Sequence, residues 1–189
     1  MIRRPPRSTP KPSSAASDVY KRQRQRVMIA IALSCDPQVL IADEPTTALD
    51  VTIQAQILDL VKRLRNELGM AIVWVTHDLG VVASLADRVM VMYSGFIVER
   101  ADVKKLYGDP KHPYTKALMT SIPTIYALPR QRLPSISGAI PHPQNRPGGC
   151  PFHPRCPSFI EGTCNTGVPH LTELNDSSNV RCFLYEATQ

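Results

Sequence analysis

Two acidic residues stand side by side directly after a short apolar run. Asp43 and Glu44 follow residues 39–42, Val-Leu-Ile-Ala, a pattern typical of a strand that brings its last residues to the edge of a sheet. One carboxylate of such a pair can hold Mg²⁺, directly or through water, and its neighbour can polarise an attacking water. The same residues also fit an ordinary strand followed by a capping acid pair. The pair alone is therefore only moderately specific for phosphoryl transfer.

A histidine follows the next apolar run in a comparable position. Residues 71–75 are Ala-Ile-Val-Trp-Val, and they lead into Thr76-His77-Asp78. Because ligands of parallel α/β sheets bind at the carboxyl ends of the strands, we expect His77 to lie near the carboxylate pair. A lone histidine at a strand end is most often an ordinary residue. Its place beside the carboxylates makes it a candidate for the same site.

The elements that must position these residues alternate between strand and helix patterns. Asp50 is suited to the N-cap of a long helix and Gly69 to its C-terminal stop. The alternation predicts an α/β fold with buried parallel strands covered by helices, and Cys35 is expected to pack on an apolar helix face. Helix patterns cover residues 24–35, 50–69 and 79–85, and strand patterns cover 39–42, 71–75, 89–93 and 96–98.

The motifs together resemble those of the ABC ATPases. Residues 43–50, Asp-Glu-Pro-Thr-Thr-Ala-Leu-Asp, resemble the Walker B motif and the D-loop of that family. Residues 76–78 resemble its switch-histidine loop, and the helix beginning at Arg24 resembles the helix that follows the Leu-Ser-Gly-Gly-Gln signature. The fold implied by the resemblance is a P-loop NTPase-like (ABC ATPase) parallel sheet with flanking helices, truncated at the N-terminus.

The resemblance also implies a role for each matching residue. Asp43 would hold Mg²⁺ at an ATP site, Glu44 would be the general base for the attacking water, and His77 would contact the γ-phosphate. Asp50 would lie in the D-loop at a dimer interface. Gln23 would be the remnant of the signature. The implied cofactors are ATP and Mg²⁺.

Two parts of the family pattern are missing from the sequence. All nine glycines lie at Gly69 or later, so the chain contains no Gly-x-x-x-x-Gly-Lys-Ser/Thr run, the Walker A loop that cradles phosphates. The signature positions hold residues 19–23, Val-Tyr-Lys-Arg-Gln, which include bulky side chains where small residues are expected. We therefore expect this chain to be inactive as an ATPase on its own.

The first 22 residues differ in composition from the rest. They carry five of the six net positive charges, are rich in Pro, Ser and Arg, and lack apolar periodicity, so we expect disorder. They also resemble a peptide seen at the ends of unrelated proteins predicted from short-read assemblies, and we expect them not to be native to this protein. Because the remaining chain is nearly neutral, its charge does not indicate a nucleic-acid partner.

The rest of the chain divides into two predicted regions. Residues 23–108 form a partial ABC ATPase domain, and residues 109–189 form a C-terminal extension. The longest apolar run, residues 27–33, is far shorter than the roughly 20 residues that span a bilayer. No secretory signal pattern precedes it. We expect a cytoplasmic protein that lies peripherally at the inner face of the plasma membrane.

The start of the extension narrows the family. Residues 111–118, Lys-His-Pro-Tyr-Thr-Lys-Ala-Leu, resemble the stretch that opens the extension of oligopeptide/dipeptide permease ATPases. This implies an ATP-hydrolysing subunit that energises peptide uptake, with nickel as a related substrate. The implied partners are two transmembrane permease subunits, a second ABC ATPase subunit and, indirectly, an extracytoplasmic peptide-binding protein. The alternatives are a non-transport ABC ATPase and a non-enzymatic fragment that binds a metal or an iron–sulfur cluster.

Four of the five cysteines lie in the extension, at Cys150, Cys156, Cys164 and Cys182. This Pro- and Gly-rich segment has few apolar residues and needs a cross-link, such as a disulfide or a bound metal, to be stable. Disulfides, however, are rare in the cytosol. The short Cys pair usual for structural zinc is missing. Spacing alone leaves an iron–sulfur cluster, zinc and reduced thiols open. Resemblance to the permease ATPases, whose C-terminal cysteines can hold a four-iron, four-sulfur cluster, favours the cluster.

Overall fold

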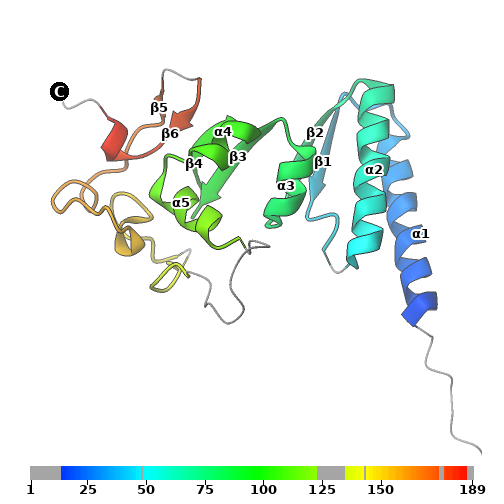
Figure 1. Cartoon of the computed structure of the whole chain (residues 1–189), viewed down its shortest axis with the longest axis horizontal. Coiled ribbons are helices and arrows are strands. Elements are labelled where there is room, and N and C mark those ends of the chain that lie inside the picture. Colours follow the sequence, from blue (N-terminus) through cyan, green and yellow to red (C-terminus); the bar gives the residue numbers. More distant parts are fainter. Residues whose placement is uncertain (1–13, 48, 123–134, 143, 175–176, 187–189) are drawn as a thin grey trace, which may run out of the picture. The chain divides into compact units, whose positions relative to one another are not determined.

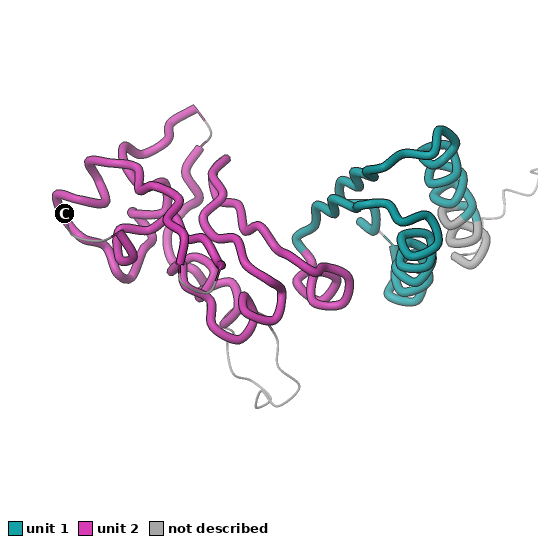
Figure 2. Tube along the Cα trace, turned by 90° about the horizontal axis from the view of Figure 1, so that it is seen from above, with its two compact units in different colours: residues 1–77 teal, residues 78–189 magenta. Residues whose placement is uncertain are grey.

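The computed structural model describes residues 14–47, 49–122, 135–142, 144–174 and 177–186, with only the backbone described for most of residues 14–22. The chain divides into two compact units, residues 1–77 and residues 78–189 (Figure 2). In the described part of the chain, no helix is both long enough and apolar enough to cross a membrane.

Unit 1 combines a parallel pair of strands with two long helices (Figure 1). The strands β1 and β2 run side by side, with Val39 opposite Ala71 at one end and Asp43 opposite Val75 at the other. The α/β class and the parallel pairing expected from the sequence are therefore confirmed. In chain order the elements are α1 (Ser14–Leu33), β1 (Val39–Asp43), α2 (Val51–Leu68) and β2 (Ala71–Val75).

Helix α2 forms the core of unit 1 and begins and ends where the sequence predicts. The Asp50 carboxylate accepts a hydrogen bond from the Ile53 N–H at the first turn, and Gly69 closes the helix in the left-handed conformation, with φ of 64°. The apolar stripe of α2 is buried against Ile72 and Trp74 of β2 and against Ile29 of α1. The core residues of the stripe are Ile53, Ile57 and Val61. Packing of this face is what orients β2 and β1.

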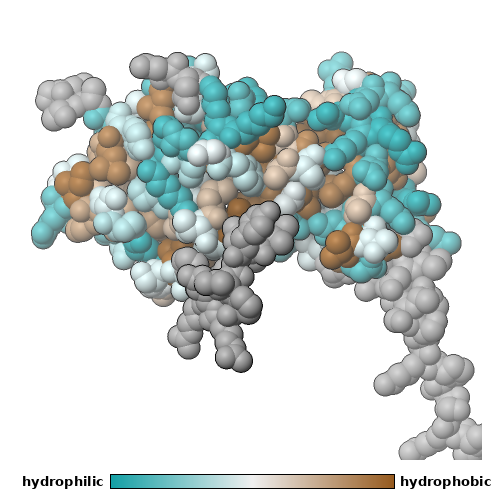
Figure 3. All heavy atoms as spheres, in the orientation of Figure 1, coloured by the Kyte–Doolittle hydropathy of each residue, from teal (hydrophilic) through white to brown (hydrophobic). Residues whose placement is uncertain are grey.

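Only one face of the β1–β2 pair is covered, which differs from the expectation of fully buried strands. Exposure alternates along both strands, as the two-residue period of a strand requires. Leu40 and Ile72 are half-buried, whereas Ile41 is 72% exposed and Val39 52% exposed. Figure 3 shows hydrophobic side chains reaching the surface in both units.

Helix α1 starts earlier than the sequence analysis predicts. The predicted helix begins at Arg24, but α1 begins at Ser14, so residues 14–22 are helical where we expected disorder. Residues 1–13 lie outside the described part. The helix ends at Leu33, and Cys35 follows it as an exposed residue. The expectation that Cys35 packs on an apolar helix face is therefore wrong.

Unit 2 is built around an antiparallel sheet with the strand order β3-β4-β6-β5. The sequence analysis placed residues 89–93 in the parallel sheet, but β3 instead pairs antiparallel with β4. Ser94 and Gly95 explain this, since both have positive φ (47° and 84°) and form the two-residue turn of a tight hairpin. The elements are α3 (Leu79–Leu85), β3 (Arg88–Tyr93), β4 (Phe96–Asp102), α4 (Val103–Gly108), α5 (Pro113–Thr120), β5 (Thr172–Glu173) and β6 (Asn179–Val180), with short 3₁₀ turns at His153–Arg155 and Phe183–Tyr185.

An aromatic cluster joins the cysteine-bearing segment to the hairpin within unit 2. Phe152 is 1% exposed, and its ring lies 5.2 Å from that of Tyr93 and 5.4 Å from that of Tyr114. The buried cysteines Cys150 and Cys164 belong to the same core. Unit 2 therefore has one continuous core, to which β3, β4, α5 and the cysteine segment all contribute.

Candidate functional site

The carboxylate pair and the histidine lie together at the carboxyl ends of β1 and β2. Asp43 is the last residue of β1, and the Glu44 N–H donates to the Val75 carbonyl over 2.9 Å, which extends the pairing by one residue. His77 follows β2 by two residues. Parallel pairing in this register brings the two strand ends level, so two segments distant in sequence meet at one edge of the sheet.

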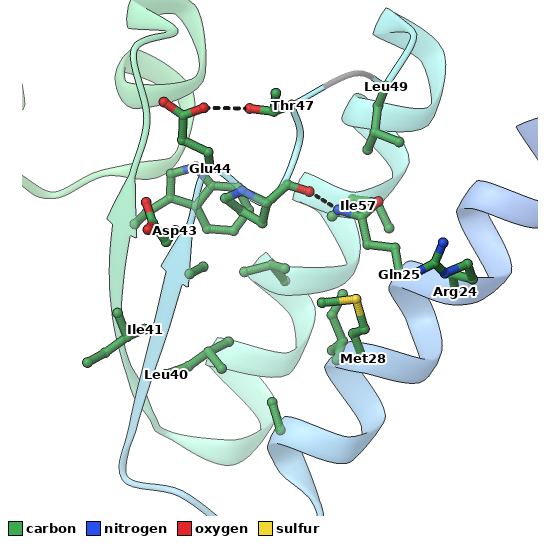
Figure 4. A pocket seen from close by; sticks show the side chains of 16 residues that line it. Arg24, Gln25, Met28, Leu40, Ile41, Asp43, Glu44, Thr47, Leu49 and Ile57 are labelled. Carbon is green, nitrogen blue, oxygen red and sulfur yellow. Dashed lines mark hydrogen bonds between the residues drawn. The ribbon is translucent and has the colours of Figure 1, made fainter.

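The carboxylate of Glu44 is bound at both oxygens. His77 Nδ1 lies 3.0 Å from Oε1, and the Thr47 hydroxyl donates to Oε2 over 2.9 Å. Figure 4 shows the second contact, with Glu44 and Thr47 facing each other across the turn. All three residues are exposed. The Thr47 contact is a part of the site that the sequence analysis missed, although a hydroxyl three residues after an acid is the visible signal for it.

These two contacts set the acidity of Glu44. The hydrogen bond with His77 is the largest influence and lowers the pKa of the carboxyl, and the hydrogen bond from Thr47 lowers it further. Partial burial acts in the opposite direction and is outweighed. Glu44 is therefore an ionised carboxylate at neutral pH, the form that can accept a proton from water.

The backbone at Glu44 lies in the left-handed region, with φ of 44°. This conformation is uncommon for a residue other than glycine and is typical of sites where the surrounding structure enforces it. A turn follows, closed by the Thr47 N–H donating to the Glu44 carbonyl over 3.1 Å. The turn lifts the Glu44 side chain off the end of β1, away from the exposed carboxylate of Asp43.

Helix α1 contacts the same turn through Gln25. The Gln25 amide donates to the carbonyl of Pro45, as Figure 4 shows. A cavity of about 490 Å³ lies beside this contact, between α1, β1, α2 and β2. Its lining includes two buried polar atoms without a hydrogen-bond partner among the described residues, Gln25 Oε1 and Trp74 Nε1. The helix that follows the signature position is thus attached to the loop that carries Glu44.

The remaining residues of the predicted ATP site are placed differently. Asp50 is the N-cap of α2, and its Oδ1 accepts from the Ile53 N–H over 2.9 Å, so this side chain has a structural role within the chain. Gln23 is exposed on α1. Neither residue contacts the Glu44 and His77 pair through a hydrogen bond that the structure describes.

The four cysteines of the extension are gathered in unit 2 but do not form a metal site as they stand. Cys150, Cys164 and Cys182 are buried and Cys156 is half-buried, and all four are free thiols. Burial raises the pKa of Cys182 to about 11, and the three other thiols contribute to the same shift. Among the described residues, however, no three His, Cys, Asp or Glu side chains form a group that could hold a metal ion.

Backbone N–H groups surround these sulfur atoms. The Ile160 N–H donates to Cys164 Sγ over 3.5 Å. Backbone hydrogen bonds from Phe152, Ser158 and Leu184 lower the pKa values of Cys150, Cys156 and Cys182 respectively, although burial still raises each pKa overall. The set therefore supplies four sulfurs with N–H donors, which fits an iron–sulfur cluster in the number and kind of ligands but not in their present placement.

The burial of two polar residues of unit 2 was not predicted from the sequence. Glu99 is 1% exposed on β4, and its two carboxylate oxygens accept from the N–H groups of Lys111 and His112 over 2.7 and 2.8 Å. His112, also 1% exposed, accepts from the Tyr114 N–H and caps α5. Burial lowers the pKa of His112 to about 4. The Lys-His-Pro-Tyr stretch is thus a buried anchor between β4 and α5.

Comparison with known proteins decides the family. Residues 98–164 match the family model described as the oligopeptide/dipeptide transporter, C-terminal region. The chain is 56% identical over 163 residues to an oligopeptide transport ATP-binding protein of Bacillus subtilis, a match that covers 86% of this chain and 49% of that protein. The chain belongs to the ATP-binding proteins of the oligopeptide/dipeptide transporter family. The resemblance seen in the sequence is therefore confirmed.

Further relatives of this transporter family give the same result. A peptide import ATP-binding protein of Brucella melitensis is 54% identical over 160 residues, covering 85% of this chain and 47% of that protein. The chain spans about half the length of the curated relatives it matches. Among solved structures, cbiO1 from Clostridium perfringens, described as part of the ABC transporter complex cbiONQ, is 36% identical with a TM-score of 0.44, over 47% of this chain and 35% of that one.

Proposed function

We propose that residues 23–189 belong to the ATP-hydrolysing subunit of an ABC importer that energises oligopeptide or dipeptide uptake. The observation that carries the proposal is the meeting of Glu44 and His77 at the carboxyl ends of two parallel strands. The family match supplies the peptide-import context, since the relatives are named for oligopeptide transport and peptide import. The whole protein would lie at the cytoplasmic face of the membrane with two permease subunits and a second ATPase subunit.

Each residue of the site has a proposed role. Glu44 orients the attacking water and accepts its proton, and His77 holds Glu44 from one side while facing the γ-phosphate of ATP. Asp43, exposed beside Glu44, would hold Mg²⁺, which takes one or two carboxylates together with waters and substrate phosphates and so needs no three-residue protein cage. When bound, Mg²⁺ neutralises charge on the phosphates. Asp50 and Gln23 are proposed to face the second subunit.

The residues that cradle the ATP phosphates are not among the 189 of this chain, so the test must include the coding sequence upstream of Gln23. Reading that sequence from the source DNA should reveal Leu-Ser-Gly-Gly before Gln23 and a Gly-x-x-x-x-Gly-Lys-Ser/Thr run further upstream. The longer subunit should hydrolyse ATP, and Glu44→Gln should reduce kcat by at least about 100-fold, the usual contribution of a general base. Hydrolysis that survives Glu44→Gln unchanged would refute the assignment.

We also propose that the four cysteines of the extension hold a four-iron, four-sulfur cluster, with zinc as the alternative. Four thiols and their backbone N–H donors support this, and binding would require the thiols to turn toward a common centre. Anaerobic purification followed by iron, sulfide and zinc analysis tests it. About four iron and four sulfide per chain, lost in Cys156→Ser, would support the cluster, whereas one zinc per chain would support the alternative. A metal-free protein would exclude both.

A further inference from the structure

Glu44 is held at both carboxylate oxygens, and the resemblance to the ABC family assigns a role to His77 but none to Thr47. The second contact, from the Thr47 hydroxyl to Oε2, is as short as the first. We propose that Thr47 is a positioning residue for Glu44, and that its hydrogen bond fixes the plane of the carboxylate that acts on water. The inference rests on the proposed function, because it assigns Thr47 a part in the work of the same base.

The local chain geometry brings the Thr47 hydroxyl to Glu44. The backbone turn between Glu44 and Thr47 is closed by the Thr47 N–H on the Glu44 carbonyl, which places the two side chains on the same side of the turn. The Gln25 amide holds the Pro45 carbonyl inside that turn. These two hydrogen bonds therefore help to maintain a backbone conformation at Glu44 that is costly for a residue with a Cβ.

Two hydrogen bonds restrain the orientation of the Glu44 carboxylate more than one hydrogen bond does. A general base must present a lone pair to the attacking water in a defined direction, and a misplacement of the order of 1 Å can cost about 100-fold in rate. A single hydrogen bond to Oε1 leaves the Glu44 side chain free to exchange between rotamers that keep that contact. The second hydrogen bond, to Oε2, restricts the side chain to one rotamer, and each oxygen keeps a lone pair for water.

An alternative is that Thr47 merely stabilises the turn. Thr47 is exposed, and an exposed turn hydrogen bond contributes little to global stability. Replacement by Val, which has the same shape but no hydroxyl, should then leave folding intact while removing the contact. Any effect of Thr47→Val on the Glu44 side chain or on kcat therefore reports positioning and not the loss of the fold.

The first test uses this chain and needs no ATP. With the Glu44 side chain ¹³C-labelled, NMR scalar couplings at fixed neutral pH should show one dominant rotamer in the unmodified protein. Thr47→Val should show rotamer averaging, Thr47→Ser should restore the single rotamer, and Thr52→Val, an exposed threonine on α2, should match the unmodified protein. A single Glu44 rotamer in Thr47→Val would overturn the proposal.

The second test uses the longer ATP-binding subunit. Thr47→Val should lower kcat roughly three- to tenfold, as expected for one charge-assisted hydrogen bond near the surface, with the KM for ATP unchanged. Thr47→Ser should recover the rate. Equal kcat in Thr47→Val would overturn the proposal. If the unmodified subunit does not hydrolyse ATP, the proposed function fails, and the rotamer result still decides whether Thr47 holds Glu44.

Discussion

Glu44 and His77 are separated by 33 residues of sequence, yet Nδ1 of His77 lies 3.0 Å from Oε1 of Glu44. The β1–β2 register produces this contact, since Asp43 and Val75 are paired at the last rung of the ladder and each of the two residues follows within two positions. The contact is therefore a property of strand pairing and would be lost with a shift of register. Its chemical consequence is an ionised carboxylate held beside an imidazole.

Removal of the His77 imidazole should raise the pKa of Glu44. The hydrogen bond with His77 is the largest of the influences that lower this pKa, so His77→Ala should move the carboxyl titration to higher pH, toward its ordinary range. ¹³C NMR of the labelled Glu44 carboxyl measures the shift directly. His170→Ala, which removes an exposed histidine of unit 2, should leave the Glu44 titration in place. An unchanged midpoint in His77→Ala would show that the contact is absent in solution.

His112 should make unit 2 sensitive to mild acid. Its folded-state pKa of about 4 lies below the ordinary value of 6.5, so the unfolded chain binds the proton more tightly. The stability that neutral His112 confers is full above about pH 6.5 and is lost as the pH falls toward 4, by about 3 kcal/mol in total. Urea unfolding at several pH values measures this loss.

A matched variant separates His112 from other titrating groups. His112→Asn keeps a side-chain acceptor at the N-cap of α5 but cannot be protonated in this range. Its free energy of unfolding should fall less between pH 6.5 and pH 4 than that of the unmodified protein. Identical pH slopes for the two proteins would contradict a buried neutral His112.

The buried Glu99 should be far more important for stability than an exposed glutamate. Glu99→Ala leaves the N–H groups of Lys111 and His112 without their acceptors, which should cost roughly 2–4 kcal/mol in the free energy of unfolding. Glu99→Gln keeps one acceptor oxygen and should cost less. Glu161→Ala, at an exposed position, should change stability by at most about 0.5 kcal/mol. Chemical denaturation of the three variants measures the order of their free energies of unfolding. Equal values for Glu99→Ala and Glu161→Ala would contradict a structural role for the buried Glu99 carboxylate.

Two substitutions should separate the capping role of Asp50 from its proposed role at the dimer interface. Asp50→Ala removes the cap of α2 and should lower the stability of unit 1 by about 1 kcal/mol, whereas Asp50→Ser keeps a capping oxygen and should be nearly neutral. Circular dichroism during thermal unfolding measures both. If Asp50→Ser is stable but lowers ATPase activity in the longer subunit, the carboxylate acts at the proposed dimer interface beyond its capping role.

Much of unit 1 could be predicted because its signals are local. Asp50 and Gly69 mark the ends of α2 by their own chemistry, and Ile57 and Val61, which recur at helical spacing, lie on its buried face. The approach of Glu44 and His77 followed from one general rule about strand ends. Thr47 lies three residues after Glu44 in the sequence, but its contact was missed because it also depends on the positive φ at Glu44, which residue types do not indicate.

Unit 2 was harder to predict because the direction of one strand and a set of buried polar contacts both differ from expectation. Residues 89–93 were expected to be one more parallel strand, but the turn at Ser94 and Gly95, both with positive φ, makes them half of an antiparallel hairpin. The buried Glu99 was not foreseen either. A glutamate in a strand usually faces solvent, and its partners at Lys111 and His112 lie beyond the whole of α4.

The pairing of β4 with β6 sets the order in which unit 2 can assemble. Glu99 lies opposite Val180 and Arg100 opposite Asn179, and the Arg100 guanidinium donates to the Asn179 amide oxygen at a separation of 79 residues. Contacts this remote in sequence slow folding, because a large loop must close before they form. During synthesis, the hairpin of β3 and β4 is complete long before its neighbouring strand exists. The edge of β4 must therefore stay unpaired until residue 180 has been made, and in that interval it is open to pairing with another molecule.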